Sequence, residues 1–162
     1  MIKYGSIIDV KIDILPFLTG KKKADYKSSF VQNGDVIFAD TAEDETVGKV
    51  SEIQGITDDS IVSGLHTFAC RPTTKFAPCF LGHYLNSDSY HNQILKIMQG
   101  IKVLSISKSN LAKTDMAFPT SQEEQNKIAY VFNNLDNTIT LHQKELKKYQ
   151  NLKKALLQKM FC

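Results

Sequence analysis

The spacing of the hydrophobic residues divides the chain near residue 118. Before that point, short apolar runs alternate with turn signals built from Gly, Pro and Asn. Short runs that are rich in Val, Ile and Phe are typical of β-strands. We therefore expect strands within residues 6–10, 34–40, 47–53, 60–72 and 101–107.

One segment of this first part has a helical pattern instead. Apolar residues within residues 80–98 recur at helical spacing on both sides of Asn86-Ser87-Asp88, and Gly100 follows them. Glycine is common just after the end of a helix. The pattern predicts two helices with a break at 86–88, inside a domain in which strands dominate.

After Pro119 the period changes to that of one long helix. Ser121 and Glu124 have the spacing of a capping box, with Thr120 as a competing cap, and neither Gly nor Pro follows. Residues 133–138 contain several poor helix formers, which predict a kink or a break there. Mostly apolar residues occupy a heptad series of positions: Ile128, Phe132, Leu135, Ile139, His142, Leu146, Tyr149, Lys153, Leu156 and Met160.

This heptad stripe predicts a partner helix. Residues 135–160 span about 40 Å as a helix, and a domain at one end cannot cover a stripe of that length. A coiled coil with a second helix covers it, whereas the alternative is that the helix packs along its own domain. His142 and Lys153 are polar positions that can specify the register of the pair. The expected fold class is α+β: a β-rich domain over 1–118, then a long coiled-coil helix over 119–162.

Composition and charge add limits to this picture. The chain has 162 residues, no apolar run of membrane-spanning length, and three cysteines without a CxxC pair, which is typical of a reduced cytoplasmic protein. The net charge is +3, and the excess of basic residues lies after residue 120. A basic helix favours a polyanionic partner only weakly, because a solvated helix face has the same composition.

Residues 64–72, "GLHTFACRP", carry side chains that could be catalytic or bind metal. On a helix, His66 and Cys70 would share a face and could bind zinc, with Cys79 and either His83 or His91 as further ligands. The flanking Gly and Pro and the β-forming residues favour a strand, in which Phe68 separates the two side chains. The strand has Leu65, Phe68 and Ala69 as candidate core positions, and its period alone does not fix which face points inward.

Other catalytic patterns are weak. Asp40 and Glu43, with Lys49 nearby, could form a metal-dependent nuclease site, but a solvated acidic loop is the simpler interpretation. The chain has no P-loop, GxGxxG, HExxH or GxSxG motif. We therefore expect no autonomous enzyme, no cofactor and no metal site.

The loop of residues 18–29 is basic and contains one aromatic residue, which favours contact with phosphate groups. Exposed lysine loops are also common without any such role.

Three stretches together resemble the specificity subunits of type I restriction–modification systems: residues 33–53, 61–72 and 118–161. The third is the most specific, with a proline, then "EEQNKIA", then a lysine-rich helix that ends "LLQKMF". The resemblance covers essentially the whole chain. It implies a target recognition domain that reads half of a split site in double-stranded DNA. It also implies a conserved helix that pairs antiparallel with a counterpart and docks methyltransferase subunits, and through them restriction subunits.

The chain departs from this family in two ways. It has one recognition domain and one helical region where the family's subunits have two, and it looks short at the front, with no tryptophan. The resemblance therefore implies a half-length form that dimerises, or pairs with another specificity chain, through the helix. The alternative is a protein-interaction module that binds such a chain or a methyltransferase without reading DNA.

The resemblance and the residue types give two sets of candidate residues. The candidates for DNA contact are Lys21, Lys22, Lys23, Tyr26, Lys27, Thr46, His66, Arg71 and Lys75. The candidates for helix pairing are Ile128, Phe132, Leu135, Ile139, His142, Leu146, Tyr149, Leu156 and Met160.

Overall fold

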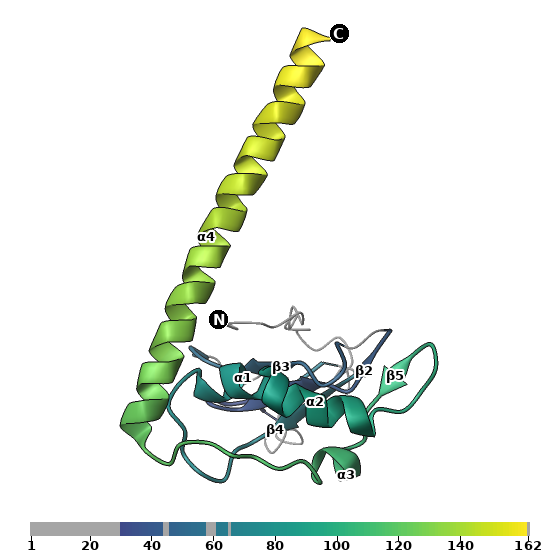
Figure 1. Cartoon of the computed structure of the whole chain (residues 1–162), viewed down its shortest axis with the longest axis vertical. Helices are drawn as coiled ribbons and strands as arrows, with labels where there is room; N and C mark the ends of the chain where they lie inside the picture. Colours follow the sequence, from purple (N-terminus) through teal and green to yellow (C-terminus); the bar gives the residue numbers. More distant parts are fainter. Residues whose placement is uncertain (1–29, 44–45, 58–60, 65, 162) are drawn as a thin grey trace.

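The computed structural model describes residues 30–43, 46–57, 61–64 and 66–161. Its order of elements is mixed, with short strands and helices followed by one long helix (Figure 1). The predicted α+β fold class is confirmed. The predicted strand at residues 6–10 lies outside the described residues.

A three-stranded antiparallel sheet forms the centre of the domain. β1 (Val36–Ala39) lies between β3 (Val50–Glu52) and β4 (Thr67–Cys70). All four residues of β1 are buried, as expected for the middle strand of a covered sheet. Each of these strands lies within a predicted run, but each is shorter than that run.

A second, two-stranded sheet pairs β2 (Thr41–Ala42) with β5 (Leu104–Ser105). β5 lies in a predicted run, whereas β2 lies just beyond the predicted run 34–40, in the segment interpreted as an acidic loop. The backbone N–H of Ile106 donates to the carbonyl of Asp40 at 2.9 Å, so this small sheet adjoins the end of β1.

Two short helices cover one face of the central sheet, and the predicted helix pair is confirmed. α1 (Phe80–Leu85) and α2 (Asp88–Ile97) pack their apolar side chains against Val36 and Phe38. The break falls at Asn86 as expected. Its side-chain amide donates to the carbonyl of Val50 at 2.7 Å and accepts from the Val50 N–H at 2.9 Å, which fixes the break against β3.

One expected core position on β4 is wrong. Phe68 packs against the main core as predicted, together with Cys70, but Ala69 is exposed. Side chains alternate between the two faces of a strand, so Phe68 and Ala69 cannot both point inward. Leu65, the third expected core position, lies outside the described residues.

The long helix α4 (Gln122–Met160) has 39 residues without a break and follows a course without a sharp bend (Figure 1), so the predicted kink or break at 133–138 is wrong. Poor helix formers cost only tenths of a kcal/mol each, which the flanking turns outweigh. Two of them also contact the domain: His83 Nε2 lies 3.1 Å from Asn133 Oδ1, and His83 Nδ1 lies 3.9 Å from Asp136 Oδ2. The predicted cap is confirmed, because the Ser121 side chain accepts from the Glu124 N–H.

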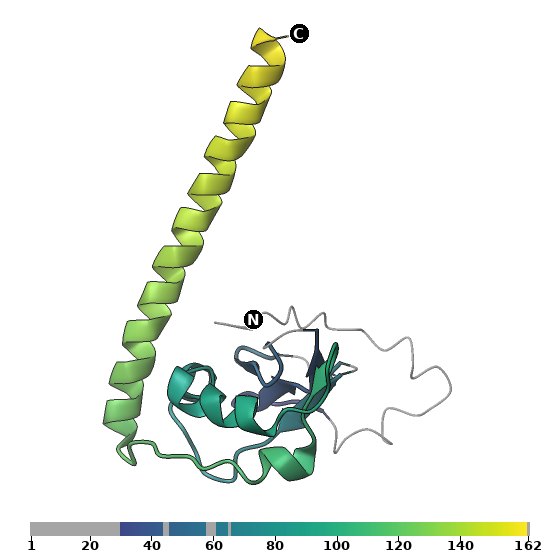
Figure 2. The same ribbon diagram turned by 45° about the vertical axis from the view of Figure 1, so that its right-hand side comes forward.

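The first turns of α4 are anchored to the domain. The buried Gln125 side chain accepts from the Ala77 N–H at 2.9 Å and donates to the Pro119 carbonyl at 2.7 Å. Ala129 is also buried. From there the helix, about 58 Å long in all, extends away from the domain (Figure 2). A short helix, α3 (Lys108–Leu111), which the sequence pattern did not predict, precedes the connection to α4. None of the helices in the described ranges is long and apolar enough to cross a membrane.

Candidate nucleic-acid interface

The structure describes four of the nine predicted DNA contacts, and it places these four in two groups. The other five, Lys21, Lys22, Lys23, Tyr26 and Lys27, lie outside the described residues. The four described contacts lie at opposite ends of the central sheet, where β1 pairs with β4 from Ala39↔Thr67 to Val36↔Cys70. We call these the far end, with Thr46 and His66, and the helix-side end, with Arg71 and Lys75.

At the helix-side end, Arg71 is held by an ion pair. Its Nε donates to Asp35 Oδ1 at 2.9 Å, and its Nη2 donates to Asp35 Oδ2 at 2.8 Å and to the Phe30 carbonyl at 2.9 Å. The Arg71 side chain is 49% exposed, whereas that of Asp35 is 5% exposed. A guanidinium in this arrangement has donors left for an external acceptor, but its orientation is set by the fold.

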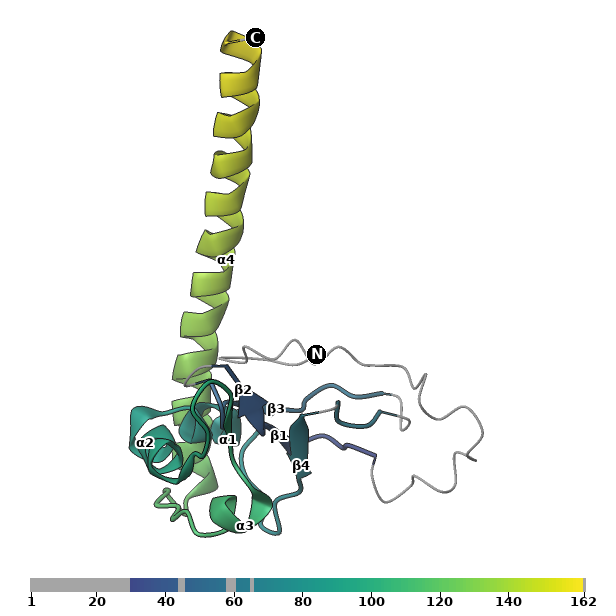
Figure 3. The ribbon, with the colours of Figure 1, turned by 90° about the vertical axis from the view of Figure 1, so that its right-hand side faces the viewer.

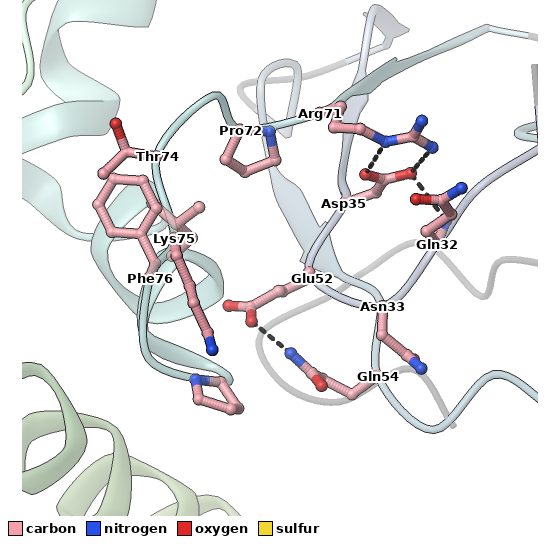
Figure 4. Close-up of a pocket in the computed structure, with 13 residues that line it drawn as sticks. Gln32, Asn33, Asp35, Glu52, Gln54, Arg71, Pro72, Thr74, Lys75 and Phe76 are labelled. Carbon is pink, nitrogen blue, oxygen red and sulfur yellow. Dashed lines mark hydrogen bonds and ion pairs between the residues drawn. The ribbon is translucent and has the colours of Figure 1, made fainter. Parts of the chain in front are cut away.

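Arg71 and Lys75 flank a cavity of about 350 Å³, whose lining also includes Glu52 and Gln54 (Figure 4). The Lys75 side chain is exposed, and its backbone carbonyl accepts from Gln122 Nε2 at 2.6 Å, at the first residue of α4. The helix-side end is therefore tied to the base of the long helix.

The Glu52 carboxylate, which lines this cavity, has a structural role that the sequence did not indicate. Glu52 is 3% exposed, and it accepts from the N–H groups of Cys79 at 2.6 Å and Gly82 at 2.9 Å, and from Gln54 Nε2 at 2.7 Å. It thus caps the N-terminus of α1 from a neighbouring strand, where a negative charge is favourable. The N-cap residue Cys79 has a left-handed backbone, with φ at 68°.

At the far end, His66 has a constrained backbone and an accessible ring. Its φ is +62°, a conformation that is costly for a residue with a Cβ. Its carbonyl accepts from the Asp40 N–H at 3.0 Å, and its Nδ1 lies 3.9 Å from Asp40 Oδ1. The side chain is 66% exposed. Thr46 lies in the turn before β3, where its carbonyl accepts from the Lys49 N–H.

The far end also gathers basic residues that sequence reasoning missed. Lys108 Nζ lies 5.4 Å from the centre of the ring of Phe68, the second residue of β4, and His66 comes just before that strand. Asn110 Nδ2 donates to the Ile97 carbonyl at 3.4 Å, which joins α3 to the end of α2. Four exposed lysines that are five or six residues apart in the sequence thus lie on adjoining elements: Lys96, Lys102, Lys108 and Lys113. The exposed Glu43, which follows β2, adds an opposite charge to the same region.

The stripe on α4 is mostly uncovered. Ile128 is half-buried against the chain's own core, and His142 is exposed with its Nδ1 3.3 Å from Glu145 Oε2. Seven further stripe residues are 47–71% exposed: Phe132, Leu135, Ile139, Leu146, Tyr149, Leu156 and Met160. Charge is distributed unevenly along the helix. Residues 144–160 carry six lysines and one glutamate, whereas residues 122–143 carry three acidic residues and one lysine.

Residues 11–151 match the family model described as the type I restriction modification DNA specificity domain. The chain belongs to this family. A curated relative, the putative type I restriction enzyme MjaX specificity subunit of Methanocaldococcus jannaschii, is 27% identical over 160 residues. The match covers 96% of this chain and 37% of that protein, so the chain spans well under half of the relative's length.

In this specificity domain, the side chains of residues 64–72 that could be catalytic are dispersed. His66 lies in the turn before β4, whereas Cys70 is the last residue of that strand. Burial raises the pKa of the Cys70 thiol, with a smaller opposing effect of Lys108, so the reactive thiolate is disfavoured at neutral pH. Within the described ranges, His, Cys, Asp and Glu form no group of three or more that could hold a metal ion.

Proposed function

We propose that this chain is a non-catalytic DNA-recognition module that reads one half of a split site for a type I restriction–modification complex. Membership of the DNA specificity domain family supports the recognition role. The observation that carries the finer proposal is a small domain fixed at one end of a long helix (Figure 3), together with the exposed apolar stripe of that helix. Such a helix holds two recognition domains at a set distance when two copies pair.

The far end of the sheet is the DNA-reading face in this proposal. His66 has an accessible ring on a fixed backbone, so it can reach base edges or phosphate without a large entropic cost. The lysines on α2, α3 and the loop between them neutralise phosphates. Lys75 and the remaining donors of Arg71 contact the DNA backbone where it passes the base of α4.

The charge distribution on α4 supports antiparallel pairing of two copies. A parallel pair would place the two lysine-rich halves side by side, where like charges repel. An antiparallel pair instead brings each lysine-rich half against the more acidic first half of its partner, and it also opposes the two helix dipoles. The two domains then lie at opposite ends of the pair and are related by a two-fold axis, which suits the two halves of a split palindrome.

Catalysis would lie in other subunits. Methyltransferase subunits would dock on the paired helices, restriction subunits would join through them, and the complex would act in the cytoplasm, where its DNA is. The module itself needs no cofactor in this proposal, because binding to DNA and to those subunits is its whole contribution.

The test is selection of DNA from duplexes that contain two randomised half-sites with different spacers, with and without methyltransferase subunits. We expect the full-length chain to enrich one bipartite sequence with one spacer length. His66→Ala should change the enriched sequence. Lys75→Ala should lower affinity for all sequences and reduce the salt dependence, and Lys144→Ala on the helix serves as the control.

Two results would contradict the proposal. Retention of methyltransferase without retention of any duplex would identify a protein-interaction module that does not read DNA. Magnesium-dependent cleavage by this chain alone would identify a nuclease.

A further inference from the structure

We propose that the apolar pocket at the base of α4 receives Phe161 from the second copy of the chain. This inference rests on the proposed pairing and adds the contact that fixes its register. The pocket lies between α1 and α4, has a volume of about 460 Å³ and includes the side chains of Phe80, Tyr84, Ile128 and Phe132.

The pocket is continuous with the heptad stripe. Ile128 and Phe132 are the first two positions of the stripe, and both line the pocket. A partner helix that covers the stripe must therefore end over the pocket or pass across it. The remaining walls of the pocket come from the domain, mainly from α1. The site therefore needs both α4 and the domain.

The register follows from covering the whole stripe. When two antiparallel copies overlap fully, every stripe position meets another one: 128 meets 160, 132 meets 156, 135 meets 153, 139 meets 149 and 142 meets 146. In that register Phe161 of one copy arrives beside Ile128 of the other. A shift by one heptad would leave the last apolar positions of each helix uncovered.

Phe161 is a suitable occupant because its own chain does not use it. It lies just after the end of α4 and is 81% exposed, and Met160 before it is 71% exposed. An aromatic side chain that enters a partly formed apolar pocket is the usual strong contact of a protein interface. The two-fold symmetry of the pair makes this contact twice, once at each end.

The test uses the fact that the chain contains no tryptophan. Phe161→Trp places one indole at the proposed contact. We expect its fluorescence emission to shift to the blue as the protein concentration is raised through the dimerisation range, because the indole leaves water. The matched control is Leu141→Trp, at a helix position that is 57% exposed and outside the stripe, whose emission should not shift.

Sedimentation equilibrium gives the second measurement. Phe161→Ala should raise the dimer dissociation constant by roughly 10- to 30-fold, as expected for a buried aromatic anchor. Ser89→Trp should do the same by filling the mouth of the pocket, since Ser89 is an exposed residue of its wall. The double variant should be little worse than either single one, because both remove the same contact.

The outcomes separate this inference from the pairing itself. If the wild-type chain forms a dimer that Leu146→Asp dissociates, while Phe161→Ala leaves the dissociation constant within twofold, the pairing stands and the pocket contact is wrong. If the wild-type chain is a monomer at all concentrations, both are wrong. Binding of the Phe161→Trp indole to a methyltransferase subunit alone, with no shift on self-association, also overturns the inference.

Discussion

Arg71, the residue after β4, forms a bidentate ion pair with Asp35, the residue before β1. The contacts are 2.9 Å and 2.8 Å long, and the carboxylate also accepts from the Gln32 N–H at 2.8 Å. A carboxylate that is removed from water needs such partners. Arg71 therefore stabilises the domain, whether or not it also contacts DNA.

We expect Arg71→Ala to lower the free energy of unfolding by about 2 kcal/mol, because it leaves Asp35 buried with fewer partners. The value is below that for a fully buried pair since the arginine is half exposed. Arg71→Lys should recover only part of the loss, because lysine cannot make both contacts. Urea unfolding measures this. An unchanged unfolding curve with weaker DNA binding would instead make Arg71 a DNA contact without a structural role.

Glu52 provides a second prediction. Glu52→Ala removes acceptors for two N–H groups at the start of α1, so we expect a loss of about 2–4 kcal/mol in unfolding free energy. Glu52→Gln keeps the shape and one acceptor oxygen, so it should cost less. Glu43→Ala, at an exposed site, is the control and should change stability by less than about 0.5 kcal/mol. A loss as large in the control would mean that net charge, rather than the cap, is responsible.

Stability should fall above about pH 9. Burial raises the pKa of Tyr90, against a smaller lowering effect of its hydrogen bond to Thr114, and burial likewise raises the pKa of Cys70. The unfolded chain loses these protons first, from ordinary values of 10.0 and 9.0. Between the unfolded and folded pKa values the native state therefore binds more protons, and unfolding becomes easier as the pH rises.

The measurement is the unfolding free energy from pH 7 to 11 for the wild-type chain and for Tyr90→Phe. The variant loses the hydrogen bond to Thr114, so it should be less stable at pH 7. Its curve should nevertheless decline less steeply at high pH because one titrating group is gone. Parallel curves for the two proteins would show that other groups govern the alkaline limit.

Local signals account for what the sequence could predict. The Ser121 cap, the break at Asn86 and the helix pair around it depend on neighbouring residues, and all three are present. The partners of Arg71 and Glu52 are 36 and about 30 residues away in the chain, so no local pattern reveals them. The same holds for the lysines at the far end, which lie on different elements and come together only in the fold. The predicted kink at 133–138 failed because tertiary contacts of Asn133 and Asp136 use the residues that looked unfavourable.

The pairing of α4 can be tested by a single charge in the stripe. Leu146 is 57% exposed in one chain, so Leu146→Asp should leave the fold and the unfolding curve of the domain unchanged. In an antiparallel pair, position 146 meets His142 and becomes buried, and an aspartate there is costly to remove from water. We expect the wild-type chain to sediment as a dimer and the variant as a monomer. Leu141→Asp, which is equally exposed but outside the stripe, should stay dimeric; dissociation of both variants would place the interface on a different face of the helix.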